Sequence, residues 1–265
     1  MMKKLISLLC IFALLFAFAA CKNDKENGDR ELASDVTPGY VSTLRLVSGA
    51  GTENLVLAGE TAGRLYTVNT DALTVFLDGE PAAASDLKNG MLLMPDAGVW
   101  EPWPAQLVGC TVRAKSTVDK KEDHGDLCGL YLQVLEDLWT EDSGLNGDIM
   151  YISVDLENAP GGLTDGEKAA VAWIFAGRHN AQPLTLGFEA LKENGYVKPN
   201  ELYWENGLLF SIKAAEKGSN SASKITFDAQ KWRSGEGAIF FTACTAKRGA
   251  GAAWEPYKAG GFAIS

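Results

Sequence analysis

The chain has 265 residues and a formal net charge of −10 at neutral pH, and apolar residues make up 46% of it. An apolar fraction of this size can build a globular core, so an intrinsically disordered chain is excluded. The acidic excess argues against binding to nucleic acid, because both molecules would carry negative charge. Five cysteines in a chain of this length also exclude a fold held together mainly by disulfide bridges.

Residues 1–20 have the three parts of a secretory signal peptide, namely a basic start, an apolar run and small residues before a cleavage point. The apolar run over 5–18 is shorter than the roughly 20 residues that a spanning helix needs. Phe18-Ala19-Ala20-Cys21 resembles the lipobox of bacterial lipoproteins, although that family prefers Leu at the first position. The resemblance implies that Cys21 is diacylated and becomes the new N-terminus. The alternative is an ordinary signal that happens to precede a cysteine.

Residues 21–38 are polar and charged, and they contain no aromatic side chain. Such a segment cannot bury enough apolar surface to fold, so we expect a flexible tether between the lipid and the folded part. The expected location is therefore the outer face of the cell membrane, with the lipid on Cys21 as the membrane contact. Removal of the signal takes away Lys3 and Lys4 and leaves a net charge of −12.

Residues 39–157 show short apolar segments separated by turn residues, with no convincing helix between them. The pattern predicts a small antiparallel β-barrel or sandwich. The expected strands are 41–47, 55–57, 65–68, 73–77, 91–94, 107–112, 127–135 and 149–154.

Two segments of this part, Asp86-Leu87-Lys88-Asn89-Gly90-Met91 and Glu101-Pro102-Trp103-Pro104-Ala105-Gln106, are similar to a motif of small OB-like barrels found in bacterial lipoproteins. The similarity covers about a tenth of the chain. It implies an OB-like barrel and no particular chemistry.

A segment rich in Pro and Gly at 157–162 predicts a domain boundary. Directly after it, Thr164 and Glu167 have the spacing of a capping box, which predicts a helix that ends near Gly177. A second helix is expected over 186–193, with Thr185 as its N-cap.

The remaining apolar segments alternate with period two. Asn206-Gly207 between two such segments predicts a hairpin. Residues 162–265 should therefore form an α+β domain, with two helices packed on an antiparallel meander. Its expected strands are 202–204, 208–212, 225–227, 238–244 and 262–264.

The chain offers few candidates for catalysis. Histidine is the most common general base, and the chain has only two, His124 in a charged loop and His179 at a helix end. A positive charge on His179 would interact favourably with the helix dipole. A metal site at Asp123, His124 and Asp126, with Cys128 as a further candidate ligand, lacks the paired Cys or His ligands typical of zinc. The acidic segment 141–148 lacks the order of an EF-hand. No P-loop, dinucleotide fingerprint or nucleophile elbow is present, so we expect neither a metal nor another cofactor.

Two other features are candidates for a role. Trp100 and Trp103 lie in a Pro-containing connection between strands. We expect one or both to fold back and close the end of the barrel, and the alternative is that exposed indoles contact a ligand. Cys110 and Cys128 could face each other on neighbouring strands and form a disulfide, with buried free thiols as the default.

The sequence therefore favours a non-catalytic binding or accessory module at the cell surface, with a polysaccharide, a peptide or a protein as its partner. The alternative is a surface hydrolase of glycans or peptides that uses acidic residues. Paired carboxylates for such a reaction depend on a spacing in three dimensions.

Overall fold

The protein is described from a computed structural model. The structure describes residues 37–40, 43–101, 103–117, 123–198, 200–249 and 253–265. The predicted signal, Cys21 and nearly all of the predicted tether lie outside these residues. Residues 35–265 belong to one compact unit. Within the described part of the chain, no helix is both long and apolar enough to span a bilayer.

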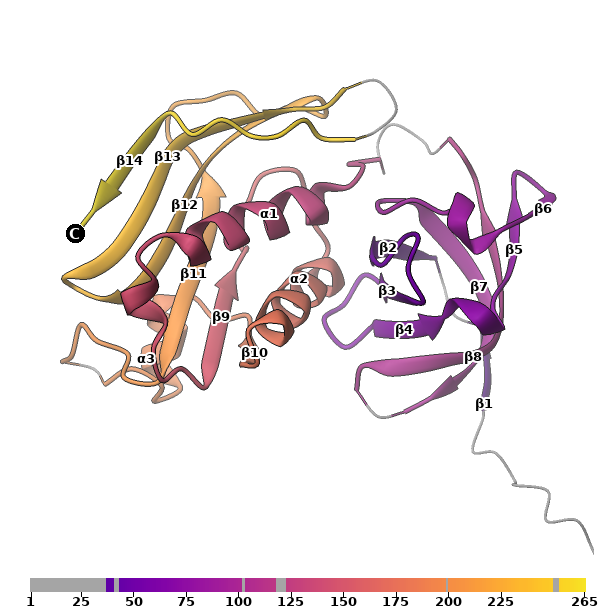
Figure 1. Cartoon of the computed structure of the whole chain (residues 1–265), viewed down its shortest axis with the longest axis horizontal. Helices are drawn as coiled ribbons and strands as arrows, with labels where there is room; N and C mark the ends of the chain where they lie inside the picture. Colours follow the sequence, from indigo (N-terminus) through magenta and orange to yellow (C-terminus); the bar gives the residue numbers. More distant parts are fainter. Residues whose placement is uncertain (1–36, 41–42, 102, 118–122, 199, 250–252) are drawn as a thin grey trace, which may run out of the picture. The chain divides into compact units, whose positions relative to one another are not determined.

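The first sheet has eight strands, which pair in the order β1-β7-β2-β3-β4-β8-β5-β6 (Figure 1). The strands are β1 (Thr37–Tyr40), β2 (Leu44–Ser48), β3 (Asn54–Ala58), β4 (Leu65–Asn69), β5 (Thr74–Leu77), β6 (Glu80–Ala82), β7 (Leu92–Trp100) and β8 (Ala105–Ala114). Short 3₁₀ helices cover Thr70–Ala72 and Ala84–Asp86. An additional pairing of β7 with β8 closes the strands β7, β2, β3, β4 and β8 into a five-stranded barrel.

The sequence predicted an antiparallel barrel, but the barrel also contains parallel pairs. β8 runs parallel to both β4 and β5, with Tyr66 opposite Ala105 and Val75 opposite Val112. The interior is filled by alternate residues of each strand, as the period of two predicts. Its buried side chains include Leu44, Leu46, Leu55, Leu57, Val68, Leu93, Leu107, Cys110 and Val112.

The second sheet has six strands in the order β10-β9-β11-β12-β13-β14. They are β9 (Tyr151–Asp155), β10 (Gln182–Leu184), β11 (Gly207–Ala214), β12 (Lys224–Ser234), β13 (Gly237–Lys247) and β14 (Gly261–Ile264). The helices are α1 (Leu127–Thr140), α2 (Asp165–Arg178) and α3 (Phe188–Glu193), with a 3₁₀ helix at Ser143–Asn146. β11 to β14 form an antiparallel meander, while β9 runs parallel to β10 and β11.

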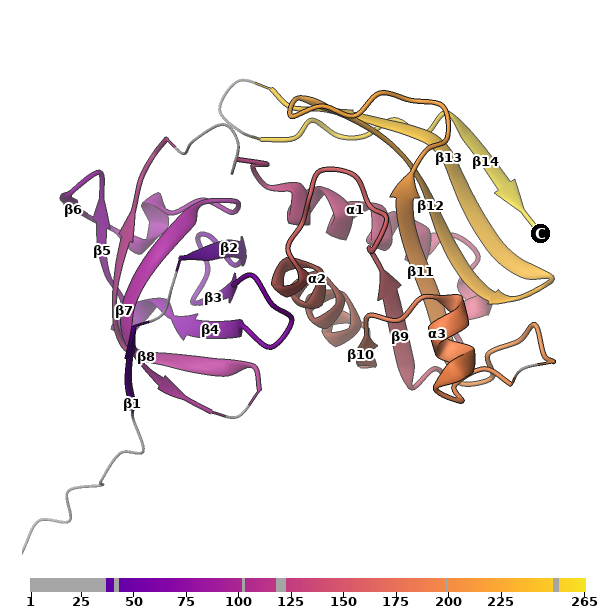
Figure 2. The same ribbon diagram turned by 180° about the vertical axis from the view of Figure 1, so that it is seen from behind.

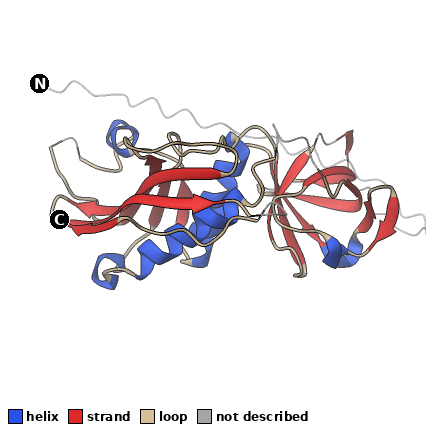
Figure 3. Ribbon diagram, turned by 90° about the horizontal axis from the view of Figure 1, so that it is seen from above, coloured by secondary structure: helices blue, strands red, loops and turns tan. Residues whose placement is uncertain are grey.

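Each face of this sheet has its own core. Leu208, Phe210 and Ile212 of β11 share a cluster with buried residues of α1 and α2. Leu209 lies on the other face and packs with Leu191 of α3. The helices therefore lie on opposite sides of the strands, with α1 in front in Figure 1 and α3 in front in the reverse view of Figure 2. Figure 3 shows the same helices in blue and the strands in red.

The segment 127–135, predicted as a strand, belongs to helix α1. The side chain of Asp126 caps this helix by accepting a hydrogen bond from the Gly129 N–H at 2.9 Å. Both α1 and β9 were assigned to the first domain, but they pack with the second sheet. The first sheet ends at Ala114, so the predicted boundary at 157–162 does not coincide with the change of sheet.

Three local predictions in the second part are also wrong. α3 is capped by Gly187, not by Thr185. Gly207 is the first residue of β11 and not part of a hairpin turn. A side chain at Gly207 would overlap the ring of Trp204, so the glycine is needed for close packing. The predicted strand at 202–204 makes only an isolated bridge, from Tyr203 to Ser234.

Candidate functional site

The capping box predicted at the start of α2 is confirmed. The Glu167 N–H donates to the Thr164 hydroxyl at 3.2 Å, and the Thr164 N–H donates to the Glu167 carboxylate at 2.7 Å. The Thr164 hydroxyl also donates to the carbonyl of Gly59 at 2.8 Å. Because Gly59 follows strand β3, these bonds join the N-terminus of α2 to the barrel.

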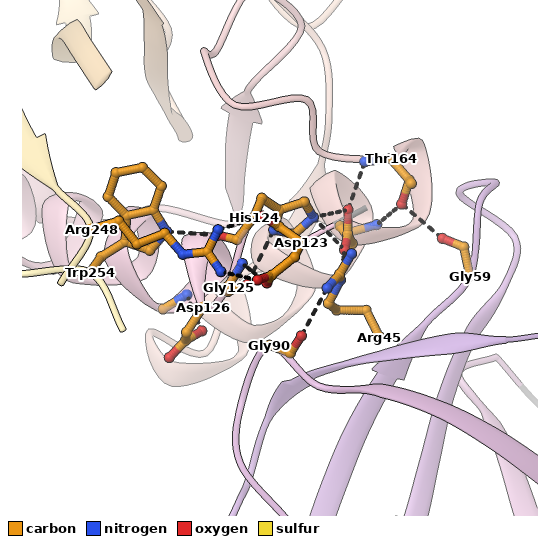
Figure 4. Close-up of polar contacts among 12 residues, drawn as sticks. Arg45, Gly59, Gly90, Asp123, His124, Gly125, Asp126, Thr164, Arg248 and Trp254 are labelled. Carbon is orange, nitrogen blue, oxygen red and sulfur yellow. Dashed lines mark hydrogen bonds and ion pairs between the residues drawn. The ribbon is translucent and has the colours of Figure 1, made fainter. Parts of the chain in front are cut away.

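Glu167 is also the centre of a buried ion cluster. Its carboxylate accepts a hydrogen bond from Arg45 Nε at 2.8 Å and lies 3.1 Å from His124 Nε2. Arg45 comes from β2 and donates a second bond to the Gly90 carbonyl at 2.8 Å. Figure 4 shows Arg45, His124 and Thr164 converging from three separate parts of the chain. The carboxylate is almost completely buried, with 1% of its side chain exposed.

The cluster keeps Glu167 ionised. Burial on its own would raise the pKa of Glu167, but the hydrogen bond and charge of His124, the Thr164 N–H and the charge of Arg45 outweigh burial and hold the pKa at about 2. A carboxylate with so low a pKa is a poor proton acceptor near neutral pH.

A second ion pair extends the cluster. Arg248, directly after β13, contacts the Asp123 carboxylate at 2.5 Å and also donates to the Asp123 carbonyl. Burial opposes ionisation of Asp123, but the bonds from Arg248 and the Gly125 N–H bring its pKa below the ordinary value. The indole N–H of Trp254 donates to the His124 carbonyl at 2.8 Å. Arg248 and Trp254, which pair with each other in an isolated bridge, thereby hold the segment that leads into α1.

A cleft of about 480 Å³ opens beside the cluster. Its walls come from the barrel, from the segment before α1, from the start of α2 and from the loop before β12. The residues around it are Thr43, Arg45, Ala58, Gly59, Glu60, Leu92, Asp123, His124, Gly161, Gly162, Thr164, Glu167, Ser221, Ala222 and Trp254.

The polar groups of this cleft bond to one another. Both ring nitrogens of His124 are engaged, Nε2 with Glu167 and Nδ1 with the Gly125 carbonyl at 3.2 Å. A general base needs a nitrogen or oxygen that can accept a proton from a substrate, and neither His124 nor Glu167 offers one in this arrangement. The geometry fits a structural junction between the barrel and the helices better than a catalytic centre.

The two tryptophans chosen from the sequence are both exposed. Trp100 ends β7 and is 52% exposed, and Trp103 lies in the β7–β8 connection and is 53% exposed. They do not fold back to close the barrel. The chain has seven tryptophans, and all seven lie in the described part. The other five, Trp139, Trp173, Trp204, Trp232 and Trp254, are buried or partly buried.

The cysteines follow the default expectation. Cys110, Cys128 and Cys244 are all free and buried. Cys110 lies inside the barrel, whereas Cys128 lies on α1 and not on a neighbouring strand, so the premise of a Cys110–Cys128 disulfide is wrong. Burial raises the pKa of Cys110 to about 11 and that of Cys244 to about 12.

His179 is the C-cap of α2, at the helix end where the sequence placed it. Its ring stacks on Trp139 with 3.7 Å between centroids, and Nε2 lies 3.0 Å from Glu136. Among the described residues, no group of three His, Cys, Asp or Glu side chains is placed to hold a metal ion. Asp126 is engaged as the cap of α1.

Two buried cations, Arg45 and Lys231, could not be recognised from the sequence. Arg45 lies within the strand expected over 41–47, and nothing local pointed to its ion pair with Glu167, which is 122 positions away. Lys231 is completely buried on β12 and donates to the carbonyls of Glu141 and Asp142 at 2.7 and 3.1 Å, just after α1 ends. Such a bond pattern is typical of a lysine that caps a helix C-terminus.

In comparisons with known proteins, no family model matches the chain, and neither a curated protein nor a solved structure matches it.

Proposed function

We propose that the protein is a non-catalytic binding module, held at the outer face of a membrane by lipid on Cys21, and that Trp100 and Trp103 contact its ligand. The observation that carries the proposal is the exposure of these two indoles, because every other tryptophan of the described chain is buried or partly buried. Leaving a large apolar side chain in water forgoes about 1.5–3 kcal/mol of burial free energy. Exposed tryptophans are therefore typical of surfaces that bury them against a ligand.

The position of the pair in the barrel supports the same conclusion. We propose that the barrel is OB-like, with β2, β3, β4, β7 and β8 as its five strands in chain order. The strand order β7-β2-β3-β4-β8 and the parallel pairing of β4 with β8 support this assignment. In OB folds the loop between the fourth and fifth strands takes part in binding oligonucleotides and oligosaccharides. Here that loop joins β7 to β8 and carries Trp103, with Trp100 at its start.

Of these ligand classes we favour an oligosaccharide. The net charge of −10 opposes a nucleic acid. The flat indole faces can cover sugar rings, and Gln106, which is paired with Trp100 across the strands, supplies a side-chain amide for hydroxyl groups. A peptide or a protein surface is the other partner class that such indoles could contact.

The buried ion cluster supports a binding module over a hydrolase. Hydrolysis needs an acid or a base that can exchange a proton with substrate. In the cleft beside this cluster, Glu167 has a pKa of about 2 and both His124 nitrogens are engaged.

The proposal is tested with glycan and peptide arrays. Wild type is compared with the double variant Trp100→Ala/Trp103→Ala and with the control Tyr203→Ala. The control removes an aromatic side chain that is 44% exposed and lies beside the second sheet, away from the β7–β8 connection. We expect the double variant to lose ligands that wild type and the control retain. The same ligands are incubated with wild type, and their masses are then measured by mass spectrometry to detect cleavage. Turnover of a bound glycan, abolished by substitution of one acidic residue, would establish the hydrolase instead.

A further inference from the structure

The two sheets end in four edge strands, and three of them contain a proline. The edges of the first sheet are β1 and β6, which contain Pro38 and Pro81. The edges of the second sheet are β10, which contains Pro183, and β14. Proline has no N–H and hinders the addition of a further strand, so it is a common protection of sheet edges.

β14 has no such protection. Its sequence Gly-Phe-Ala-Ile contains neither a proline nor a charge. Phe262 is 53% exposed and Ile264 is 63% exposed. Both belong to the same face, because their register partners on β13 are Phe241 and Ile239, two residues of the core beneath α1. The ring of Phe262 continues that core at 6.0 Å from the ring of Phe241.

The backbone of β14 is also oriented for pairing. The Ser265 N–H donates to the Ala238 carbonyl of β13 at 3.0 Å. In an antiparallel ladder the N–H and C=O of alternate residues point to the same side. The polar groups of Ala263 therefore face β13, as do those of Ser265, and the N–H and C=O of Phe262 and Ile264 face the outer edge. Figure 1 shows β14 as the outermost strand beside β13. Among the described residues, no strand pairs with this outer edge.

We propose that β14 pairs antiparallel with β14 of a second copy of this chain, so that the two six-stranded sheets become continuous across a two-fold axis at Ala263. In this register Phe262 lies opposite Ile264 of the partner subunit, and the pair occurs twice. Both pairs lie on one face, and an aromatic residue opposite a β-branched one is a favourable cross-strand pair. The outward N–H and C=O groups of Phe262 then bond to those of Ile264 of the partner subunit, as in a hydrogen-bonded pair of an antiparallel ladder.

Self-complementarity identifies a second copy as the occupant. An isologous contact must bring a surface against itself, and like charges would oppose it. β14 carries no charge in a chain whose net charge is −10. A proline interrupts each of the other three edges, and the pairing uses the free edge of both β14 strands, so the assembly stops at two copies.

Cysteine cross-linking tests the register. The two-fold axis places Ala263 opposite Ala263 of the partner subunit at a position without hydrogen bonds, where Cα atoms are about 4.5 Å apart. This separation lies within the range of about 4.4–6.8 Å that a disulfide spans. Ala263→Cys in the full chain should form a covalent dimer of about twice 28.4 kDa under mild oxidation. Ala83→Cys, at an exposed alanine of the barrel, is the matched control and should remain monomeric. Equal cross-linking of the two variants would overturn the proposal.

A second variant tests the pairing without cysteine chemistry. Ile264→Pro removes an N–H that faces away from β13, so it breaks no hydrogen bond to β13 and gives β14 the protection that the other edges have. Sedimentation of wild type should show a monomer–dimer equilibrium that shifts with concentration, and the variant should sediment as a monomer. Ile264→Lys provides the same test if the proline variant unfolds. A wild type that stays monomeric at every concentration, or that forms assemblies larger than a dimer, contradicts the proposal.

Discussion

The buried carboxylate of Glu167 allows a quantitative prediction. Its pKa lies at about 2, below the ordinary value of 4.5. At about 1.4 kcal/mol per pH unit, this difference corresponds to about 3 kcal/mol of folding free energy. Removal of one partner from a buried ion pair costs a similar amount, about 3–5 kcal/mol, because the remaining charge stays buried without compensation. Glu167→Gln, which keeps the size of the side chain, should therefore destabilise the protein by about 3 kcal/mol at pH 7.

The stabilisation contributed by Glu167 depends on pH in a defined direction. A carboxyl group whose pKa is lower in the folded state stabilises the fold above its unfolded pKa, and this stabilisation is lost as the pH falls through the folded pKa. The advantage of wild type over Glu167→Gln should therefore be complete above about pH 5 and should shrink towards pH 2. The assay is urea denaturation of both proteins at pH 7, 4 and 3, followed by far-UV circular dichroism.

Glu136 is a matched control. It also pairs with one arginine and one histidine, Arg178 at 2.9 Å and His179 at 3.0 Å, but its side chain is 26% exposed. Exposed pairs contribute about 1 kcal/mol or less, so Glu136→Gln should have a small effect. If Glu167→Gln costs no more than Glu136→Gln, or costs the same at pH 3 as at pH 7, the reasoning about the buried cluster is refuted.

Three further predictions concern the rest of the chain. Cells labelled with a fatty-acid analogue should label the wild-type protein and not Cys21→Ala, and equal labelling would exclude the lipid anchor. The three internal thiols should resist alkylation in the native protein, because all three are buried and burial raises the pKa of Cys110 to about 11 and that of Cys244 to about 12. Disulfide-linked cysteine peptides in a digest of unreduced protein would contradict the prediction of free thiols. Limited proteolysis should cut the tether first and then the exposed loop at 218–223, before 157–162, where the Pro160 carbonyl accepts a bond from α1. A first cut within α1 would contradict the described packing.

The sequence predicted local features well where one signal decided the structure. Thr164 and Glu167 gave the start of α2, and the period of two gave most strands of the barrel and the meander. The strand predicted at 127–135 failed because its residues are apolar on nearly all sides, and periodicity alone does not separate a buried strand from a buried helix. The N-cap Asp126 was the available signal, since it accepts a bond from Gly129 in the first turn.

Contacts between distant residues could not be predicted in this way. The parallel pairing of β4 with β8 brings Tyr66 next to Ala105, and no local pattern specifies such a partner. The same holds for the ion pair of Arg45 and Glu167 across 122 positions. The capping box identified Glu167 correctly, but its second role depends on the tertiary fold.

The central claim is that Trp100 and Trp103 form the ligand contact of a binding module. Its most direct test is the affinity of wild type and Trp100→Ala/Trp103→Ala for an oligosaccharide selected on the array, measured by titration calorimetry. Loss of a central aromatic contact costs about 2 kcal/mol or more, and each 1.4 kcal/mol is about a factor of ten in affinity. We therefore predict that the double variant binds at least about 30-fold more weakly with an unchanged melting temperature. An unchanged affinity in a folded double variant would contradict the account.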